Sequence, residues 1–129
     1  MIRCLNWLAI ISRPDITYIA SRLAKFNTNP PDDAIKAAKH VYRYLRGTIG
    51  LGVVFSPAAD LSQLIGHTDS NWGDNTSNLD KKSTTGYCFT IAGGPISWIS
   101  QKQRTTATST TEAEYIAQCS VTKEAVYLR

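Results

Sequence analysis

The residues of this chain best suited to chemistry are carboxylates in two short polar stretches. The first is HTDSNWG, residues 67–73, which follows the apolar pair Leu64 and Ile65. This pattern indicates a short buried strand that delivers Asp69 into a polar loop. An acid at the end of a buried strand is costly unless it is paired, hydrogen-bonded or metal-bound. The alternative is that Asp69 only caps a turn, through an Asx-type bond to Asn71.

The second stretch, STTEAEY at residues 109–115, brings two glutamates to the start of a predicted helix. Ser109 with Glu112 and Thr111 with Glu114 both fit a capping box, in which hydroxyl and carboxylate groups satisfy the free N–H groups of a helix start. Only one register can be used, so one glutamate remains available. If Ser109 and Glu112 form the cap, Glu114 points toward the strand that carries Asp69. It then shares the sheet-facing side of the helix with Ala117, Val121 and Leu128.

Two carboxylates that converge from a strand end and a helix start are suitable ligands for Mg²⁺, which takes oxygen ligands and keeps several waters. A pair of magnesium ions about 4 Å apart can activate a water and stabilise the leaving oxygen in phosphodiester cleavage. The spacing of Asp69 and Glu114 does not establish this chemistry, because two acids at this separation occur in most proteins.

The composition fits one domain with a helical extension, at 129 residues and 43% hydrophobic residues. No apolar run approaches the roughly twenty residues needed to span a bilayer. The apolar start, residues 5–11, lacks a small-residue cleavage site and lies between Arg3 and Arg13, which indicates a helix rather than a signal peptide. Three widely spaced cysteines argue against a disulfide framework or zinc site and suit a reducing compartment. They are Cys4, Cys88 and Cys119.

Helices are predicted at 3–11, from 14 to about 26, and over 32–46. In the third, Asp32 and Asp33 form the N-cap and first turn, and Gly47 is the residue that follows the helix in a left-handed conformation. Strands are predicted at 51–55, 61–68, 84–91 and 96–100, followed by a helix over 110–128. A turn is expected at 92–95. The best domain boundary lies near residues 56–60.

The third predicted helix is amphipathic and carries a row of cations. Its apolar face consists of Ile35, Ala38, Val41, Tyr42 and Leu45, and its cations are Lys36, Lys39, Arg43 and Arg46. The net charge of +4 arises in the first half, since residues 1–60 hold eight Lys/Arg and four Asp/Glu. The row is either an ordinary solvated face or a surface for a nucleic-acid backbone, where neutralised phosphates release counterions.

Five stretches together resemble the Pol polyprotein of copia-type LTR retrotransposons, in the region that runs from the end of reverse transcriptase into ribonuclease H. They occur in the family's order and cover nearly the whole chain. They are residues 12–16 (SRPDI), 41–48 (VYRYLRGT), 67–73, 82–87 (KSTTGY) with 96–98 (ISW), and 109–115. The resemblance implies an α/β (α+β) architecture. Residues 1–56 would form a helical reverse-transcriptase connection segment. Residues 57–129 would form the N-terminal part of a ribonuclease H-like mixed sheet, with three antiparallel strands and the first helix.

The resemblance also assigns roles. Asp69 and Glu114 would be the catalytic acids and Mg²⁺ ligands, within a two-metal site in the complete domain, and Glu112 would be the cap. Ser109, Thr110 and Thr111 would lie near the RNA strand of an RNA–DNA hybrid, where ribose hydroxyls can be read. The basic row would hold the template–primer duplex. The implied partners are nucleic acid and the rest of the Pol polyprotein, without a membrane. The implied location is intracellular, in cytoplasmic virus-like particles or the nucleus.

The chain departs from the family pattern at both ends. The paired aspartates of the polymerase would precede Met1. A fourth strand with a third acid, a further helix and a late acid would follow Arg129. Two carboxylates hold hydrated magnesium poorly, and an incomplete sheet leaves an edge exposed. The sequence therefore predicts a gene fragment with an ancestral nuclease site that is inactive alone. The alternatives are a non-catalytic nucleic-acid-binding module and a non-functional remnant.

Overall fold

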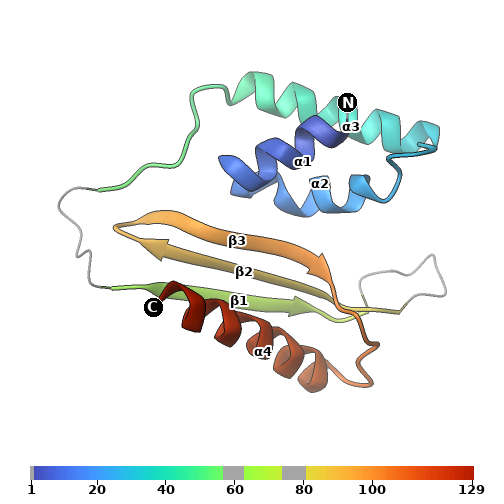
Figure 1. The fold of residues 1–129 in the computed structure, drawn as a ribbon. Helices are drawn as coiled ribbons and strands as arrows, with labels where there is room; N and C mark the ends of the chain where they lie inside the picture. The colour runs from blue at the N-terminus through green and yellow to red at the C-terminus, as the bar shows by residue number, and fades with distance from the viewer. Residues whose placement is uncertain (1, 57–62, 74–80) are drawn as a thin grey trace. The chain divides into compact units, whose positions relative to one another are not determined.

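The computed structural model describes residues 2–56, 63–73 and 81–129. These residues form four α-helices and a three-stranded antiparallel sheet, which confirms the predicted mixture of helices and strands (Figure 1). The chain divides into a first unit, Met1–Val54, and a second unit, Phe55–Arg129. No helix among the described residues is long and apolar enough to cross a membrane.

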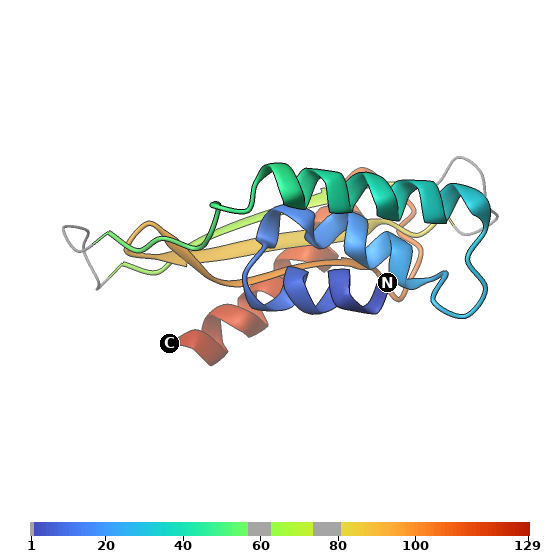
Figure 2. The ribbon, with the colours of Figure 1, turned by 90° about the horizontal axis from the view of Figure 1, so that it is seen from above.

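The first unit is a three-helix cluster. It consists of α1 (Ile2–Ile11), a short 3₁₀ helix (Pro14–Ile16), α2 (Thr17–Ala24) and α3 (Asp32–Gly47). The helix α3 runs alongside α1 and α2 (Figure 2). Apolar residues at helical spacing turn inward from all three helices and exclude water. The buried core is Ile2, Leu5, Ala9, Ile16, Ala20, Leu23, Ala34, Ala38 and Val41.

A buried arginine links the segment between α1 and α2 to the residue that follows α3. Arg13 is only 7% exposed, and its guanidinium donates to the Asp15 carboxylate at 2.7 and 3.0 Å. It also donates to the Thr48 carbonyl and hydroxyl, at 3.2 and 2.7 Å, while the Tyr44 hydroxyl donates to Asp15 at 2.8 Å. The guanidinium lowers the pKa of Asp15 below its ordinary value, chiefly through these hydrogen bonds. Two of the five quoted stretches therefore meet in one structural cluster.

The second unit contains a sheet with strand order β1-β2-β3 and one helix. Its elements are β1 (Ile65–Asn71), β2 (Thr84–Ile91), β3 (Gly94–Lys102) and α4 (Thr110–Leu128). The bounds of β2 and α4 agree with those predicted, and β3 is longer at both ends. Ala92 and Gly93 have φ angles of 51° and 77° and form the turn between β2 and β3, which is the hairpin conformation that glycine adopts readily.

The helix α4 covers one face of the sheet, mainly over β1 and also over β2 (Figure 1). The Ser97 hydroxyl donates to the Glu124 carboxylate of α4 at 2.6 Å, and the Gln103 amide nitrogen donates to the Ala113 carbonyl at 2.9 Å. On this face Phe89 is 3% exposed and lies opposite Gly66. A Cβ at Gly66 would stand 2.5 Å from the Phe89 ring, so this pairing requires glycine.

Three local predictions were wrong. Residues 51–56 contain no strand, although the Ser56 N–H donates to the Ala92 carbonyl at 2.8 Å. Leu51 and Val54 remain exposed, because apolar composition alone does not form a strand without a neighbouring ladder. Pro31 occupies the N-cap of α3 without a side-chain bond, so Asp32 and Asp33 lie in the first turn, where they favour the helix dipole. Gly47 is the last residue of α3 rather than a left-handed residue beyond it.

The strand β1 also differs from its prediction. It continues through Asp69 to Asn71, and most of its residues are exposed rather than buried. The reason is its place in the sheet, since β1 is an edge strand that pairs with β2 alone among the described strands. The predicted start of this strand at 61–62, and most of the loop predicted at 70–82, lie outside the described residues.

Candidate functional site

The end of the sheet where β1 stops is also where α4 begins. Asn71, the last residue of β1, pairs with Thr84, which in turn pairs with Lys102 near the end of β3. The indole N–H of Trp72 donates to the Ala107 carbonyl at 3.3 Å, just before α4. This bond ties the C-terminal end of β1 to the segment that leads into the helix, so the two acid-bearing stretches lie at one end of the unit (Figure 1).

Asp69 is exposed and lies two residues before the end of β1. One of its carboxylate oxygens accepts a hydrogen bond from the Ser70 N–H at 2.9 Å, so the local bond involves Ser70 and not Asn71. Side chains alternate between the two faces of a strand. Thr68 and Ser70 pair with Tyr87 and Thr85 on the face that α4 covers. Asp69 therefore projects from the opposite face of the sheet.

Glu112 caps α4 in the register that was predicted. The Ser109 hydroxyl accepts from the Glu112 N–H at 3.1 Å. The Glu112 carboxylate accepts from the N–H and the hydroxyl of Thr108, at 2.6 and 2.7 Å. These bonds lower the pKa of Glu112. The carboxylate thus reaches one residue further back than in the standard capping box, and it is engaged in holding the helix start.

Glu114 is the acid of this stretch that the cap leaves available. It is half-buried on α4, adjacent in sequence to Ala113, which with Ala117 forms the fully buried part of this helix. Asp69 and Glu114 consequently share one end of the unit but belong to different sides of the sheet, with β1 between them. The structure brings the two stretches together, but it does not place the two carboxylates on a common face.

The donor set agrees with the chemistry of magnesium. Mg²⁺ in phosphate-processing sites is typically bound by one or two carboxylates, with waters and substrate phosphates completing its shell. Within residues 2–56, 63–73 and 81–129, no group of three or more His, Cys, Asp or Glu side chains could hold a metal ion. Asp69 and Glu114, the two predicted ligands, do not share a face of the sheet in this structure.

Among the hydroxyl residues predicted to lie near RNA, Ser109 differs from the two threonines in its hydrogen bonding. Ser109 is exposed, and its hydroxyl is engaged in the cap. Thr110 and Thr111 are exposed in the first turn of α4, on the side of the unit where β1 ends. These two side chains are therefore accessible to a ligand at this end.

Sequence reasoning missed two residues that organise this end, Trp72 and Gln103. Gln103 is 5% exposed, and its amide nitrogen donates to the Thr85 hydroxyl at 3.0 Å as well as to the Ala113 carbonyl. No local pattern marks Gln103, because its burial follows from the return of α4 over the sheet. Trp72 was included in a quoted stretch, but its bond to Ala107 depends on a segment far along the chain.

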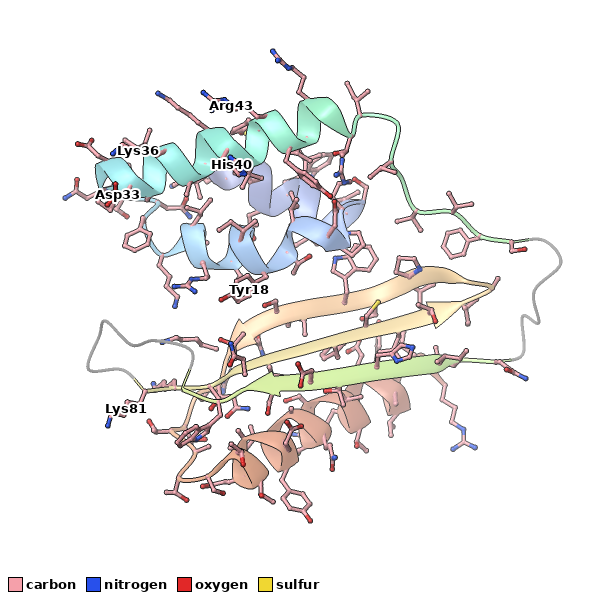
Figure 3. The ribbon with its side chains drawn as sticks, turned by 180° about the vertical axis from the view of Figure 1, so that it is seen from behind. Tyr18, Asp33, Lys36, His40, Arg43 and Lys81 are labelled. Carbon is pink, nitrogen blue, oxygen red and sulfur yellow. The ribbon has the colours of Figure 1, made fainter. Side chains whose placement is uncertain are left out.

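The four predicted cations of α3 are all exposed. They lie away from the buried Ala34, Ala38 and Val41, so the amphipathic prediction holds for this helix. Lys36 forms an exposed ion pair with Asp33 at 3.3 Å. His40 is exposed on the same helix and was not included in the predicted row; Figure 3 shows it with Lys36 and Arg43.

Comparison with known proteins gives relatives along nearly the whole chain. Secreted RxLR effector protein 161 of Plasmopara viticola is 38% identical over 122 residues, which cover 95% of this chain and 84% of that protein. The retrovirus-related Pol polyprotein from transposon TNT 1-94 of Nicotiana tabacum is 40% identical over 125 residues. The corresponding polyprotein from transposon RE2 of Arabidopsis thaliana is 38% identical over 120 residues.

These alignments cover 97% and 93% of this chain, but the chain spans only 9% and 8% of the two polyproteins. No protein-family model matches the chain, and no solved structure matches it. The chain therefore belongs to a family of proteins related to the Pol polyproteins of retrotransposons, which includes Secreted RxLR effector protein 161.

Proposed function

We propose that the chain corresponds to the junction between reverse transcriptase and ribonuclease H in a copia-type Pol polyprotein. The first unit would be the connection segment, and the second would be the N-terminal part of a ribonuclease H-like domain. Asp69 and Glu114 would contribute to metal-dependent hydrolysis of the RNA strand of an RNA–DNA hybrid. The observation that carries the proposal is the Trp72–Ala107 bond, which brings the two acid-bearing stretches to one end of the second unit.

Bound Mg²⁺ would polarise the scissile phosphate and activate water. The chain's own residues would position the substrate. Asp69 is exposed, so a phosphate and its hydrated metal can approach it without rearrangement of the sheet. The cap formed by Ser109 and Glu112 fixes the first turn of α4 and thereby the position of Glu114. Thr110 and Thr111 present hydroxyls that can bond to ribose 2′-OH groups, which distinguish RNA from DNA.

The rest of a Pol polyprotein is the proposed partner for this site. Asp69 and Glu114 lie on different sides of β1, so the two carboxylates do not together complete the shell of one metal ion. Hydrolysis therefore requires further oxygen ligands. These ligands would come from the polyprotein or from the hybrid itself. We propose an intracellular site of action for the chain, because the proposed substrate is an RNA–DNA hybrid.

The proposal is tested by titrating Mg²⁺ into the full chain while following the Asp69 and Glu114 side chains by NMR. Saturable shifts are expected at both residues, and Asp69→Asn should weaken the Mg²⁺ affinity at this end of the unit. Asp33→Asn is the matched control, since Asp33 is an exposed acid in the first unit. Absence of a Mg²⁺ response at both carboxylates in a folded chain would contradict the proposal. Hybrid cleavage is then assayed with the chain joined to the following segment of a related Pol polyprotein.

The exposed cations of α3 favour a second function, non-catalytic binding of a duplex backbone. Each phosphate that a cation neutralises releases counterions, so the affinity should fall steeply as salt rises. Replacing Lys39, Arg43 and Arg46 with alanine should weaken duplex binding and flatten its salt dependence. Replacing three exposed uncharged residues of the same unit, Asn6, Thr28 and Asn29, provides the control. Salt-independent binding would exclude this function.

A further inference from the structure

Trp72 is a fixed aromatic side chain that remains half exposed. It directly follows β1, and 50% of its surface is accessible. Its indole N–H donates at 3.3 Å to the carbonyl of Ala107, a residue that is only 4% exposed. The next residue, Gly73, has a φ of 63°, a backbone conformation that glycine adopts readily. The polar edge of the indole is therefore anchored to the protein while much of the ring surface stays accessible.

Cations lie at the same end of the sheet as this ring. Lys81 is exposed and precedes Thr84, the first residue of β2 and the partner of Asn71. Its side chain points away from the sheet in Figure 3. Arg104 is exposed and directly follows the buried Gln103 after β3. Two positive charges thus accompany an aromatic surface where β1 and β3 end and β2 begins.

Exposed hydroxyls complete the surroundings. Thr105 and Thr106 follow Arg104, and Thr110 and Thr111 lie in the first turn of α4. An aromatic plane combined with cations and hydroxyl groups matches the chemistry of single-stranded RNA. Bases stack on aromatic rings, phosphates bind cations, and ribose hydroxyls accept and donate hydrogen bonds. Recognition of a protein partner does not require this combination of aromatic, basic and hydroxyl groups.

We propose that Trp72 is a stacking platform for an unpaired base of an RNA strand that passes the end of β1. The choice of RNA rests on the proposed function, because the ring lies three residues from Asp69. The base must be unpaired, since the face of a base within a continuous duplex is covered by its neighbours. Trp72 would hold the strand beside the carboxylates and would itself take no part in bond cleavage.

The test measures binding of a fluorescently labelled single-stranded RNA dodecamer to the full chain in EDTA, by anisotropy. Trp72→Ala should weaken binding about 5- to 150-fold, the range for loss of one stacked base. Trp72→Phe keeps an aromatic plane on which a base can stack, so its RNA affinity should be within about threefold of wild type. Trp7→Ala is the matched control and should leave the affinity unchanged, because Trp7 is 62% exposed but lies on α1 in the first unit.

A second readout uses tryptophan fluorescence. In the double variant Trp7→Phe and Trp98→Phe, Trp72 is the one tryptophan of the chain. Saturable quenching by the RNA is expected, with the same midpoint as the anisotropy curve. Circular dichroism shows whether Trp72→Ala is folded. If Trp72→Ala does not fold, the RNA affinity of Trp72→Phe is compared with that of the wild type instead.

Wild-type affinity in a folded Trp72→Ala, equal losses in Trp72→Ala and Trp7→Ala, or no RNA binding by the wild type would each overturn the proposal. The proposed catalytic function is judged separately. The Mg²⁺ titration uses the wild-type chain without RNA, and Glu114→Gln should keep the RNA affinity in EDTA. A stacking failure therefore leaves the Mg²⁺ titration intact, and a failed Mg²⁺ titration leaves the RNA affinity intact.

Discussion

The two units differ in the exposure and bonding of a charged side chain, Arg13 in the first unit and Asp69 in the second. In the first, Arg13 is 7% exposed, and its guanidinium is engaged by Asp15 and Thr48. In the second, Asp69 is exposed, and its carboxylate accepts a hydrogen bond from the neighbouring Ser70 N–H at 2.9 Å. A buried guanidinium that is already engaged by several acceptors has little capacity left for a ligand, whereas an exposed carboxylate keeps lone pairs available. The Arg13 guanidinium maintains structure in the first unit, whereas the Asp69 carboxylate of the second unit is accessible to a ligand.

This comparison separates motifs that looked alike in sequence. SRPDI and VYRYLRGT are as characteristic of the family resemblance as the acid-bearing stretches, yet they meet in the cluster around Arg13. Their residues join the start of α2 to the end of α3. The acid-bearing stretches meet at the end of β1, where their carboxylates differ in exposure and in the face that they occupy.

The largest effect should come from Arg13→Ala. It removes the partner of Asp15 and both bonds to Thr48, so we expect a loss of about 3 kcal/mol in the free energy of unfolding, at the upper end for hydrogen bonds to a charged group. Urea denaturation of the full chain, with hydrogen exchange of the α1 and α3 amides, measures it. Arg22→Ala is the control, because Arg22 is exposed and bonds to the exposed Tyr18. A loss no greater than that of the control would show that the Arg13 cluster does not stabilise the unit.

Gln103→Ala should produce the largest effect in the second unit. The substitution leaves the Ala113 carbonyl and the Thr85 hydroxyl without their buried donor, which costs about 1–3 kcal/mol. Hydrogen exchange of the first turns of α4 should accelerate, and the Mg²⁺ response of Glu114 should weaken. Gln101→Ala is the matched control, since Gln101 is exposed near the end of β3, two residues before Gln103. Equal exchange in both variants would show that Gln103 does not hold α4 to the sheet.

Sequence patterns located the elements of both units better than the details of the site. The helix over 110–128 and the strand over 84–91 were predicted correctly, because capping residues, β-branched residues and turn glycines act locally. The predicted strand at 51–55 was wrong, since pairing depends on a neighbour that sequence does not reveal. For Gln103 and Trp72, burial and bonding arise when α4 returns over the sheet, so their roles required the tertiary structure.

The cap of α4 should have a smaller effect. Ser109→Ala removes the acceptor of the Glu112 N–H, and loss of such a cap typically costs about 1 kcal/mol. Urea denaturation should show this loss, whereas Ser120→Ala in the interior of the helix should cost less, because alanine favours helices. An unchanged stability in Ser109→Ala would show that Thr108 and Glu112 hold the helix start without the serine.

The smallest effect we predict is a dependence of the first unit on pH. The pKa of Asp15 is lowered from its ordinary value of 3.8, chiefly by the hydrogen bonds of Arg13. The unfolded chain therefore binds a proton at Asp15 more readily than the folded chain does, so the stabilisation is present above the unfolded pKa and is lost as pH falls through the folded pKa. Because the Asp15 side chain is 34% exposed, screening by solvent limits the contribution to under about 1 kcal/mol.

Unfolding free energies measured between neutral pH and the range below 3.8 should decline for the wild type, and Asp15→Asn should decline less. Asp69→Asn should follow the wild-type curve, because the Asp69 carboxylate has no guanidinium partner comparable to Arg13 in the part of the chain that the structure describes. A flatter curve for Asp69→Asn than for Asp15→Asn would reverse the comparison between the units. It would mean that the carboxylate of β1 contributes to folding and is less available to a ligand than its exposure indicates.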